Sequence, residues 1–310
     1  MNISRVVDVD RRLPITGEIF LDHVAHFVAG PESASRALAR AGFAPTPVSI
    51  QVNPDPAGGP LRPTGTGNVT CMLDRGYLEI LFKTADTLLG RELDAAMARY
   101  RGVHLAAFAV ADARATHARL AQSGFRMQPL VAMQRPVETE AGEDIAAFTV
   151  VRVAPGEMPE GRIQALTHLT ERTVWQPRWL AHPNGAIGLL EVVIAETDVA
   201  EAAGRFRRFL DRDARANPFG PAFHLDRGRV QLVGSASLDR LFPGLALPDL
   251  PFMAAYAIAV TSLEQVTACL QAGHVAFEPQ AGYVIAPFPD ALGVGCWVFV
   301  ENASELPWRQ

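Results

Sequence analysis

Two short stretches of the sequence place a histidine at the start of an alternating apolar pattern. The first reads L-D-H-V-A-H-F-V around His23 and the second V-H-L-A-A-F-A-V around His104, so the spacing His-x-Ala-x-Phe occurs twice. This alternation is typical of a half-buried strand, and it predicts that each histidine shares an inward face with its phenylalanine, Phe27 or Phe108. An imidazole in a pocket can bind a metal ion or transfer a proton, although a lone inward histidine is more often a hydrogen-bonded core residue. Because the spacing recurs, we interpret the two histidines as a functional pair.

Glu79 and Gln164 occupy corresponding places in a second recurring pattern. They end the sequences G-Y-L-E and G-R-I-Q, each of which opens an apolar strand. A buried carboxylate without a partner is costly, so Glu79 needs a cation close by, either a metal ion or an arginine such as Arg62. Gln164 can serve as an oxygen ligand or can be satisfied by backbone groups, and both interpretations stay open.

Three further polar residues are candidates for substrate or acid–base contacts. His168 follows Gln164 by four residues on the same strand face, where it could act as an acid or base at the pocket rim. Arg135 would suit an anionic substrate, although an exposed arginine is commoner. Asn68 can either contact the ligand or stabilise the preceding turn G-T-G. Phe27 and Phe108 would give the pocket an apolar lining.

A strand, a helix and three further strands must position these residues. In the first copy we expect a strand over 21–28, a helix over 34–41 and strands near 48–52, 67–73 and 76–82. The second copy begins at His104, and its helix end R-L-A-Q-S-G-F echoes A-L-A-R-A-G-F of the first. Further copies run over 189–235, where Glu191 stands in place of His23, and over 254–300.

The order of elements indicates an α+β protein of four βαβββ modules that form two cupped mixed β-sheets. At 310 residues the chain is long enough for about two domains. We expect a first domain over 1–174, which carries the site, and a second, degenerate module pair over 175–310. The second pair would complete the fold or form a subunit interface, so a homodimer is possible.

These motifs resemble the vicinal oxygen chelate superfamily, and within it the glyoxalase-like proteins. The resemblance rests on L-D-H-V at the opening of the first module, G-T-G-N before its third strand, G-Y-L-E-I in its last strand and V-H-L at the opening of the second module. It implies that paired modules form a cup around a divalent metal ion. The implied ligands are His23, Glu79, His104 and Gln164, with a water molecule or His168 as the alternative to Gln164.

The resemblance also implies a class of chemistry. The expected protein is a metal-dependent lyase or isomerase that acts on a small oxygenated substrate through a metal-stabilised enolate or oxyanion. Nitrogen and oxygen donors suit Zn, Fe, Ni, Mn or Co and do not choose among them. The catalytic groups would be Glu79 and His168, and the substrate would contact Asn68, Phe27, Phe108 and Arg135.

Two alternative functions stay open. The first is a non-catalytic protein that sequesters a small ligand in the cup. The second is an Fe(II) oxygenase that uses His23, His104 and Glu79 as a two-histidine, one-carboxylate triad. A ring-cleaving extradiol dioxygenase is disfavoured because the second half supplies Glu191, Gln231 and Tyr256 instead of the ligands that such enzymes carry there.

Composition excludes several other classes. The net charge is -5 and the arginines are spread among acidic residues, which argues against nucleic-acid binding. The three cysteines lie far apart without C-x-x-C spacing, so neither a disulfide framework nor a thiolate zinc site is indicated, and a reducing cytoplasm suits them. We expect no membrane span and no signal peptide, because the apolar runs are short and charges interrupt the N-terminal region.

Overall fold

The computed structural model describes residues 11–55 and 57–309, and within them the chain forms the four expected βαβββ modules. Module 1 comprises β1 (Ile19–Val28), α1 (Pro31–Arg40), β2 (Ser49–Asn53), β3 (Arg62–Met72) and β4 (Tyr77–Lys83). Module 2 comprises β5 (Gly102–Val110), α3 (Ala113–Gln122), β6 (Val131–Thr139), β7 (Gly142–Arg152) and β8 (Arg162–His168). The α+β class expected from the sequence is thereby confirmed.

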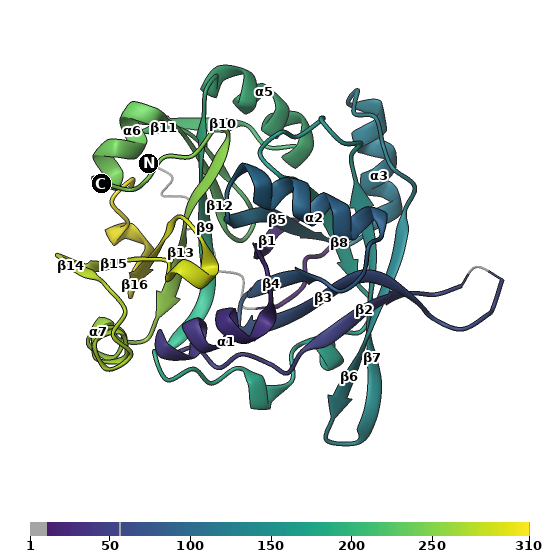
Figure 1. The fold of residues 1–310 in the computed structure, drawn as a ribbon. Coiled ribbons are helices and arrows are strands. Elements are labelled where there is room, and N and C mark those ends of the chain that lie inside the picture. Colours follow the sequence, from purple (N-terminus) through teal and green to yellow (C-terminus); the bar gives the residue numbers. More distant parts are fainter. Residues whose placement is uncertain (1–10, 56, 310) are drawn as a thin grey trace.

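The second half repeats this order with shorter strands. Module 3 comprises β9 (Ala186–Glu196), α5 (Val199–Leu210), β10 (Ala214–Asn217), β11 (Gly220–His224) and β12 (Arg229–Gly234). Module 4 comprises β13 (Phe252–Val260), α7 (Leu263–Ala272), β14 (Glu278–Gln280), β15 (Tyr283–Pro287) and β16 (Cys296–Val300). The modules are joined by α2 (Leu88–Arg99), α4 (Glu171–Val174) and α6 (Ser235–Leu241), and Figure 1 shows how these elements are arranged.

Local sequence explains where the module helices begin. Helix α1 starts at Pro31, which has no backbone N–H to satisfy in the first turn. Helix α3 starts after Asp112, whose carboxylate accepts hydrogen bonds from two backbone N–H groups of the first turn, and Asp198 does the same for α5. Each helix buries an apolar stripe against the sheet, so the same strand–helix geometry recurs in each module.

The strands of the first half close into a barrel. Their order is β1-β4-β3-β2-β6-β7-β8-β5, and an antiparallel pairing between β1 and β5 closes the ring. The opening strand of each module runs parallel to its closing strand, β1 with β4 and β5 with β8. The four strands that carry the predicted site therefore lie side by side.

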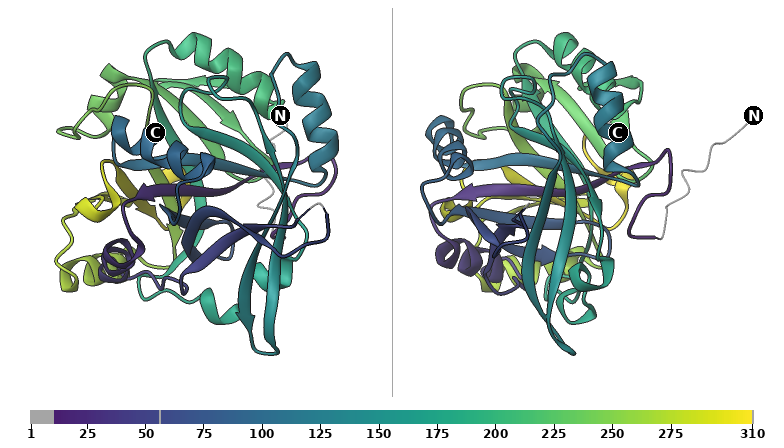
Figure 2. Two further views of the ribbon diagram at one scale, coloured as in Figure 1. Left: turned by 45° about the vertical axis from the view of Figure 1, so that its right-hand side comes forward. Right: turned by 90° about the vertical axis from the view of Figure 1, so that its right-hand side faces the viewer.

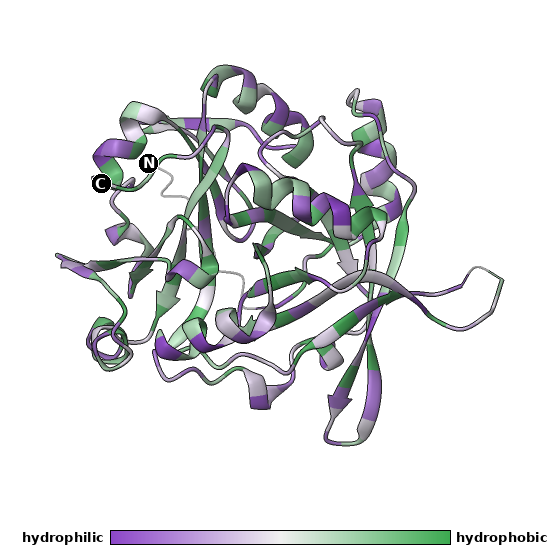
Figure 3. Ribbon diagram, viewed as in Figure 1, coloured by the Kyte–Doolittle hydropathy of each residue, from purple (hydrophilic) through white to green (hydrophobic). Residues whose placement is uncertain are grey.

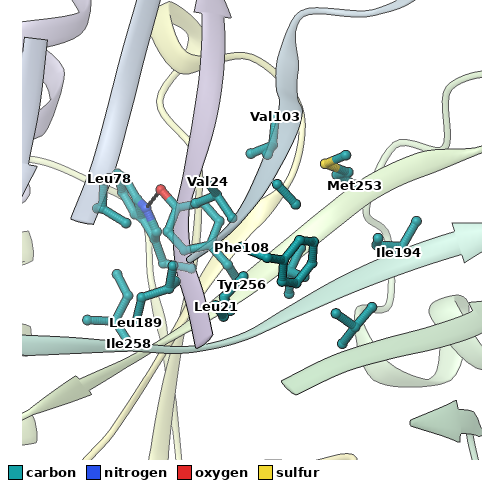
Figure 4. Close-up of a cluster of buried hydrophobic side chains, with 14 of the residues drawn as sticks. Leu21, Val24, Leu78, Val103, Phe108, Leu189, Ile194, Met253, Tyr256 and Ile258 are labelled. Carbon is teal, nitrogen blue, oxygen red and sulfur yellow. Dashed lines mark hydrogen bonds between the residues drawn. The ribbon is translucent and has the colours of Figure 1, made fainter. Parts of the chain in front are cut away.

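The two cups are joined instead of forming separate sheets. Val103 of β5 pairs with Met253 of β13, so the described strands form one continuous sheet. Behind β1 and β5, side chains of both halves share one hydrophobic core. Figure 4 shows Leu21, Val24 and Phe108 of the first half among Leu189, Ile194, Met253 and Ile258 of the second.

The hairpin of β6 and β7 extends beyond the body of the molecule (Figures 1 and 2). Its far end is hydrophilic in Figure 3, whereas its base carries the residues that face the barrel interior. Within the described part of the chain, no helix combines the length and the hydropathy needed to cross a membrane.

Candidate functional site

A cleft opens on the inner face of the first barrel. Strands β1, β4 and β8 contribute His23, Glu79 and Gln164 to its wall, and β3, β6 and β7 contribute Asn68, Arg135 and Arg152. The register explains why these side chains meet. His23 lies beside Tyr77 of β4 and opposite Ala107 of β5, and Ala107 pairs with Gln164 of β8. Because partners across a sheet point to the same side, these residues share the inner face.

The imidazole of His23 is fixed from behind by a buried carboxylate. Its Nδ1 lies 2.7 Å from Asp22 Oδ2, and its ring stacks on Tyr77 with centroids 4.3 Å apart. The other oxygen of Asp22, Oδ1, lies 2.9 Å from His168 Nε2. Since Nδ1 faces Asp22, Nε2 is the atom that His23 presents to the cleft.

The two imidazoles also determine the charge of Asp22. Burial alone would raise the pKa of this carboxyl, but His168 and His23 at hydrogen-bond distance hold the pKa well below its usual range. Asp22 is therefore ionised and accepts a hydrogen bond from each ring. Burial and the nearby carboxylates of Asp22 and Glu79 raise the pKa of Tyr77 well above its usual value, so the phenol stays neutral.

Glu79 is fixed with one oxygen toward His23. Asn68 Nδ2 donates to Glu79 Oε1 at 2.7 Å, and Gln51 Nε2 approaches the same oxygen at 3.4 Å. The second oxygen, Oε2, lies 3.6 Å from His23 Nε2. Asn68 therefore orients the carboxylate instead of simply stabilising a turn, and His23 and Glu79 form a facing pair at the cleft.

Gln164 faces the cleft but is already engaged. Its Oε1 accepts a hydrogen bond from Arg152 Nε at 3.1 Å. Neither expectation for Gln164 included this contact, because its amide oxygen is bonded to a guanidinium and not to backbone groups.

The structure does not bring His104 into this cleft. Its Nε2 lies 2.7 Å from the backbone oxygen of Tyr100, and its ring stacks on that of Tyr100. The pairing of β1 with β5 is irregular at two places, and the extra residues are Asp22 and His104. The structural counterpart of His104 is thus Asp22, and the counterpart of His23 is Leu105. The expected equivalence of His23 and His104 was therefore wrong by one residue. A shift of one residue along a strand moves the side chain to a different face.

The glycine before each closing strand supports this correction. A Cβ on Gly76 would lie 2.6 Å from the backbone oxygen of Asp22, and a Cβ on Gly161 would lie 2.4 Å from that of His104. Both glycines have positive φ, so each module needs glycine where its closing strand passes the irregular residue. The same contact therefore identifies Asp22 and His104 as equivalents.

Other predicted residues are placed as follows. Arg135 lines the cleft, whereas Phe27 lines a second cavity beside it. Phe108 packs in the core between the halves, because it lies on the outer face of β5. His168 is buried behind the cleft, where it bonds to Asp22 and does not reach the rim. The proposed substrate contact of Phe108 and the rim position of His168 are therefore corrected.

The donor atoms of the cleft do not fit the implied metal site. His23 and Glu79 offer two donors, Gln164 Oε1 is bonded to a guanidinium, and the fourth position is the aliphatic Leu105. Within the described residues, no group of three His, Cys, Asp or Glu side chains could hold a metal ion. The structure therefore assembles neither the set of four expected ligands nor the triad of His23, His104 and Glu79. The mechanism proposed for this cleft uses no metal ion.

The corresponding cup of the second half is filled by the chain itself. Glu191, in the place of His23, is fully buried, and its Oε2 accepts a hydrogen bond from Trp308 Nε1 at 2.5 Å. Arg309 donates to its other oxygen, and Arg229 Nε lies 3.6 Å from Oε2. Residues 308 and 309 thus occupy this second cup.

Four polar residues in or next to the cleft were not predicted from the sequence: Asp22, Gln51, Arg152 and Arg162. Asp22 directly precedes His23, and a carboxylate there could have been considered as its support. Arg152 and Arg162 interrupt apolar strands, and such interruptions on an inward face indicate a polar site. Gln51 carries no comparable signal, because its strand is irregular.

Comparisons with known proteins identify the fold. A family model described as a glyoxalase-like domain matches residues 21–210. A hypothetical protein from Staphylococcus aureus superposes with a TM-score of 0.64 at 9% identity, over 91% of this chain and 98% of that one. A mutant of 4-hydroxymandelate synthase from Streptomyces coelicolor superposes with a TM-score of 0.55 at 15% identity, over 92% and 94% of the two chains.

A third solved structure is only partly covered. It is a xylose isomerase-like TIM barrel/4-hydroxyphenylpyruvate dioxygenase fusion protein, with a TM-score of 0.52 at 12% identity over 94% of this chain and 51% of that one. No curated protein matches this chain in sequence. At these identities the three structures establish a shared fold alone.

Proposed function

The chain belongs to the glyoxalase-like domain family of the vicinal oxygen chelate superfamily, as its motifs predicted, and we propose that it is a lyase or isomerase that moves a proton on a small oxygenated substrate. The observation that carries this proposal is the buried Asp22–His23 pair, which presents Nε2 to the cleft. A carboxylate that accepts a hydrogen bond from Nδ1 fixes the ring and stabilises the imidazolium that forms when Nε2 takes a proton.

The proposed step is an enolisation. His23 Nε2 removes a proton from the carbon next to a substrate carbonyl, and the electrons of that C–H bond form the C=C bond of an enolate while the carbonyl electrons move to its oxygen. In an isomerase that acts on a 2-hydroxycarbonyl compound, Glu79 moves the hydroxyl proton to the enolate oxygen, and His23 returns its proton to the former carbonyl carbon while the former hydroxyl oxygen becomes the new carbonyl. In a lyase, the enolate instead re-forms its carbonyl bond and expels a leaving group from the next carbon, and that group takes the bonding electrons with it. Arg135 and Arg152 line the same cleft and supply positive charge for the oxygen.

Glu79 is the second acid–base group. Its Oε2 lies 3.6 Å from His23 Nε2, so both groups can reach one substrate carbon or oxygen. Because Asn68 holds the other oxygen, the carboxylate keeps its direction without a metal ion.

Hydrogen exchange with the solvent tests this function. Small 2-oxo acids and 2-hydroxycarbonyl compounds are incubated with the protein in D2O, and deuterium uptake next to the carbonyl is followed by NMR. We expect exchange with the parent protein and a loss of about 100-fold or more in His23→Gln. Exchange that is absent from the parent across this panel contradicts the enzyme and favours the sequestering alternative.

Treatment of the protein with a chelator tests whether the exchange depends on a metal ion. We expect the exchange rate to be unchanged after dialysis against a chelator, because the donor set does not fit an ion. Exchange that disappears with the chelator and returns with Zn, Ni, Mn, Co or Fe would restore the metal-dependent mechanism.

A further inference from the structure

Two arginine side chains stand between the cleft and a second cavity. Arg152 of β7 and Arg162 of β8 line both spaces. The wall of the second cavity is mainly apolar and includes Phe27, Ala96, Met158 and Ile163. The guanidinium groups therefore separate the acid–base pair from a space that suits an apolar group.

Together with Arg135, these arginines outnumber the two carboxylates that act on them, Glu79 and Glu92. Arg162 Nη2 donates to Glu92 Oε2 at 2.9 Å and its guanidinium lies 5.3 Å from the ring centre of Phe27. Arg152 bonds to the neutral oxygen of Gln164, although it is only 8% exposed. The ion pairs found among the described residues include none with Arg152. Glu79 and Glu92 lie near Arg152, but neither forms an ion pair with it, so a bound anion would give this buried guanidinium a direct partner.

The electrostatics of the site agree with this imbalance. Burial and the neighbouring Arg162 lower the pKa of Arg152 to about 9, and Glu92 and Glu79 oppose this shift only in part. Burial likewise lowers the pKa of Arg135, the third arginine of the cleft. A bound anion would oppose both shifts because it favours the charged guanidinium.

We infer that Arg152 and Arg162 bind the carboxylate or phosphate group of a small ligand whose apolar part lies in the second cavity. Guanidinium groups match the planar oxygen pairs of such anions. The inference rests on the proposed function, because it makes this ligand the substrate on which His23 acts.

His104 adds a polar contact in the second cavity. Its Nε2 faces the backbone oxygen of Tyr100, so Nε2 carries the hydrogen. Burial lowers the pKa of His104 to about 4, and the ring is neutral near pH 7. Nδ1 is then a buried acceptor without a partner among the described groups. A hydroxyl or N–H group of the ligand would satisfy it.

Benzoate and benzamide provide a matched pair of probes, because they share a shape and differ in charge. Binding to the full-length protein is measured by isothermal titration calorimetry, without turnover. We expect benzoate to bind and benzamide to bind at least about tenfold more weakly. Arg152→Met and Arg162→Met should each weaken benzoate binding by about 10- to 100-fold, the range for one charge-assisted hydrogen bond.

Arg36→Met is the matched control, because Arg36 is an exposed residue of α1 that lines neither cavity. Its benzoate affinity should equal that of the parent. The melting temperature of each variant is recorded, and if one arginine variant does not fold, the other still tests the site. Equal binding of benzoate and benzamide, or unchanged benzoate affinity in the folded arginine variants, overturns the inference.

Two further arms identify the anion and separate this inference from the proposed function. Inorganic phosphate and acetate compete with benzoate, and the stronger competitor shows whether the natural group is a phosphate or a carboxylate. His23→Gln should still bind benzoate. Benzoate binding without proton exchange would support the anion site and contradict the proposed enzyme. Exchange on uncharged carbonyl compounds without benzoate binding would support the enzyme and contradict the anion site.

Discussion

The chemistry of single residues in this cleft depends on what holds them. His23 would be an ordinary core imidazole without Asp22, which bonds to Nδ1 at 2.7 Å and is itself bonded by His168. Glu79 likewise depends on Asn68 for its direction. The reactive atoms therefore point into the cleft because buried polar groups behind them are paired.

Asp22→Asn tests this support. An amide at position 22 can donate to Nδ1, so the ring would present an N–H at Nε2 instead of a lone pair. We expect proton exchange to fall by about 100-fold or more, as for the loss of a general base, and the pH profile of the exchange rate to change with it. Asp74→Asn, at an exposed carboxylate, is the control. An unchanged rate and profile in Asp22→Asn would show that the pair has no catalytic role.

At the scale of strands and helices, much could be predicted from the sequence. The modules, their order and the inward face of His23 followed from the alternating pattern and the recurring helix ends. The counterpart of His23 in module 2 was not predicted correctly. The motif that ends each helix and closes with Phe43 or Phe125 recurs after 82 residues, whereas His-x-Ala-x-Phe recurs after 81. The helix spacing gives Leu105 as the counterpart of His23, so the sequence held a signal against His104.

The irregular pairing at Asp22 and His104 explains the misleading signal. A strand with an extra residue keeps its apolar composition, so its alternation alone does not reveal which residue faces inward. The arginine pair was missed for another reason. Arg152 and Arg162 lie on the adjacent strands β7 and β8, but the two cavities that both arginines line form only with side chains of β1 from the other module.

Restoring the missing donors tests the corrected register. Leu105→His combined with Gln164→Glu would place an imidazole and a carboxylate at the positions equivalent to His23 and Glu79. We expect this double variant to retain about one equivalent of Ni or Co in elemental analysis and to melt at a higher temperature with the ion, because a ligand that binds only the folded state stabilises it. His104→Ala should leave that gain intact. Metal in the parent that is lost in His104→Ala would contradict the register.

Two buried carboxyl groups lie next to each other where β9 ends. Glu196 is buried beside Glu160, and Arg205 of α5 bonds to Glu160. Burial and the neighbouring Glu160 raise the pKa of Glu196 from 4.5 to about 8. The folded protein then holds a proton that the unfolded chain releases above pH 4.5. This contribution to stability is fully present below pH 4.5 and is lost as the pH rises to about 8.

Glu196→Gln should remove that dependence. The amide keeps the shape of the protonated carboxyl, so we expect little difference from the parent at pH 5 and a higher free energy of unfolding for the variant at pH 8.5. Each unit of pKa difference is worth about 1.4 kcal/mol. Urea unfolding at the two pH values measures the effect, with Glu278→Gln at an exposed site as the control. An equal difference at both pH values would show that Glu196 does not hold the proton.

At the scale of the whole molecule, the two halves are tied through their cores. The division at 174/175 separates the modules along the chain, yet Leu21 and Phe108 pack among side chains of β9 and β13. His26 of the first half bonds to Tyr256 Oη at 2.9 Å, and Trp297 donates to the same oxygen at 2.6 Å. Separating the halves would expose this shared core to water and leave buried polar groups unpaired.

We therefore predict that the protein unfolds in a single cooperative transition and that Tyr256→Phe shifts all of it. Loss of the hydroxyl leaves His26 Nε2 and Trp297 Nε1 without a partner, which costs about 1–3 kcal/mol for each buried group left unpaired. Calorimetry gives the transition for both halves. Because the chain has four tryptophans, fluorescence is measured in variants that keep only Trp175, which packs against the first barrel, or only Trp297 of β16, with phenylalanine at the other three positions. If residues 1–174 and 175–310 were independent domains, Tyr256→Phe would lower only the transition of the second half. A common shift in both signals, together with calorimetric and van't Hoff enthalpies that agree, identifies one folding unit.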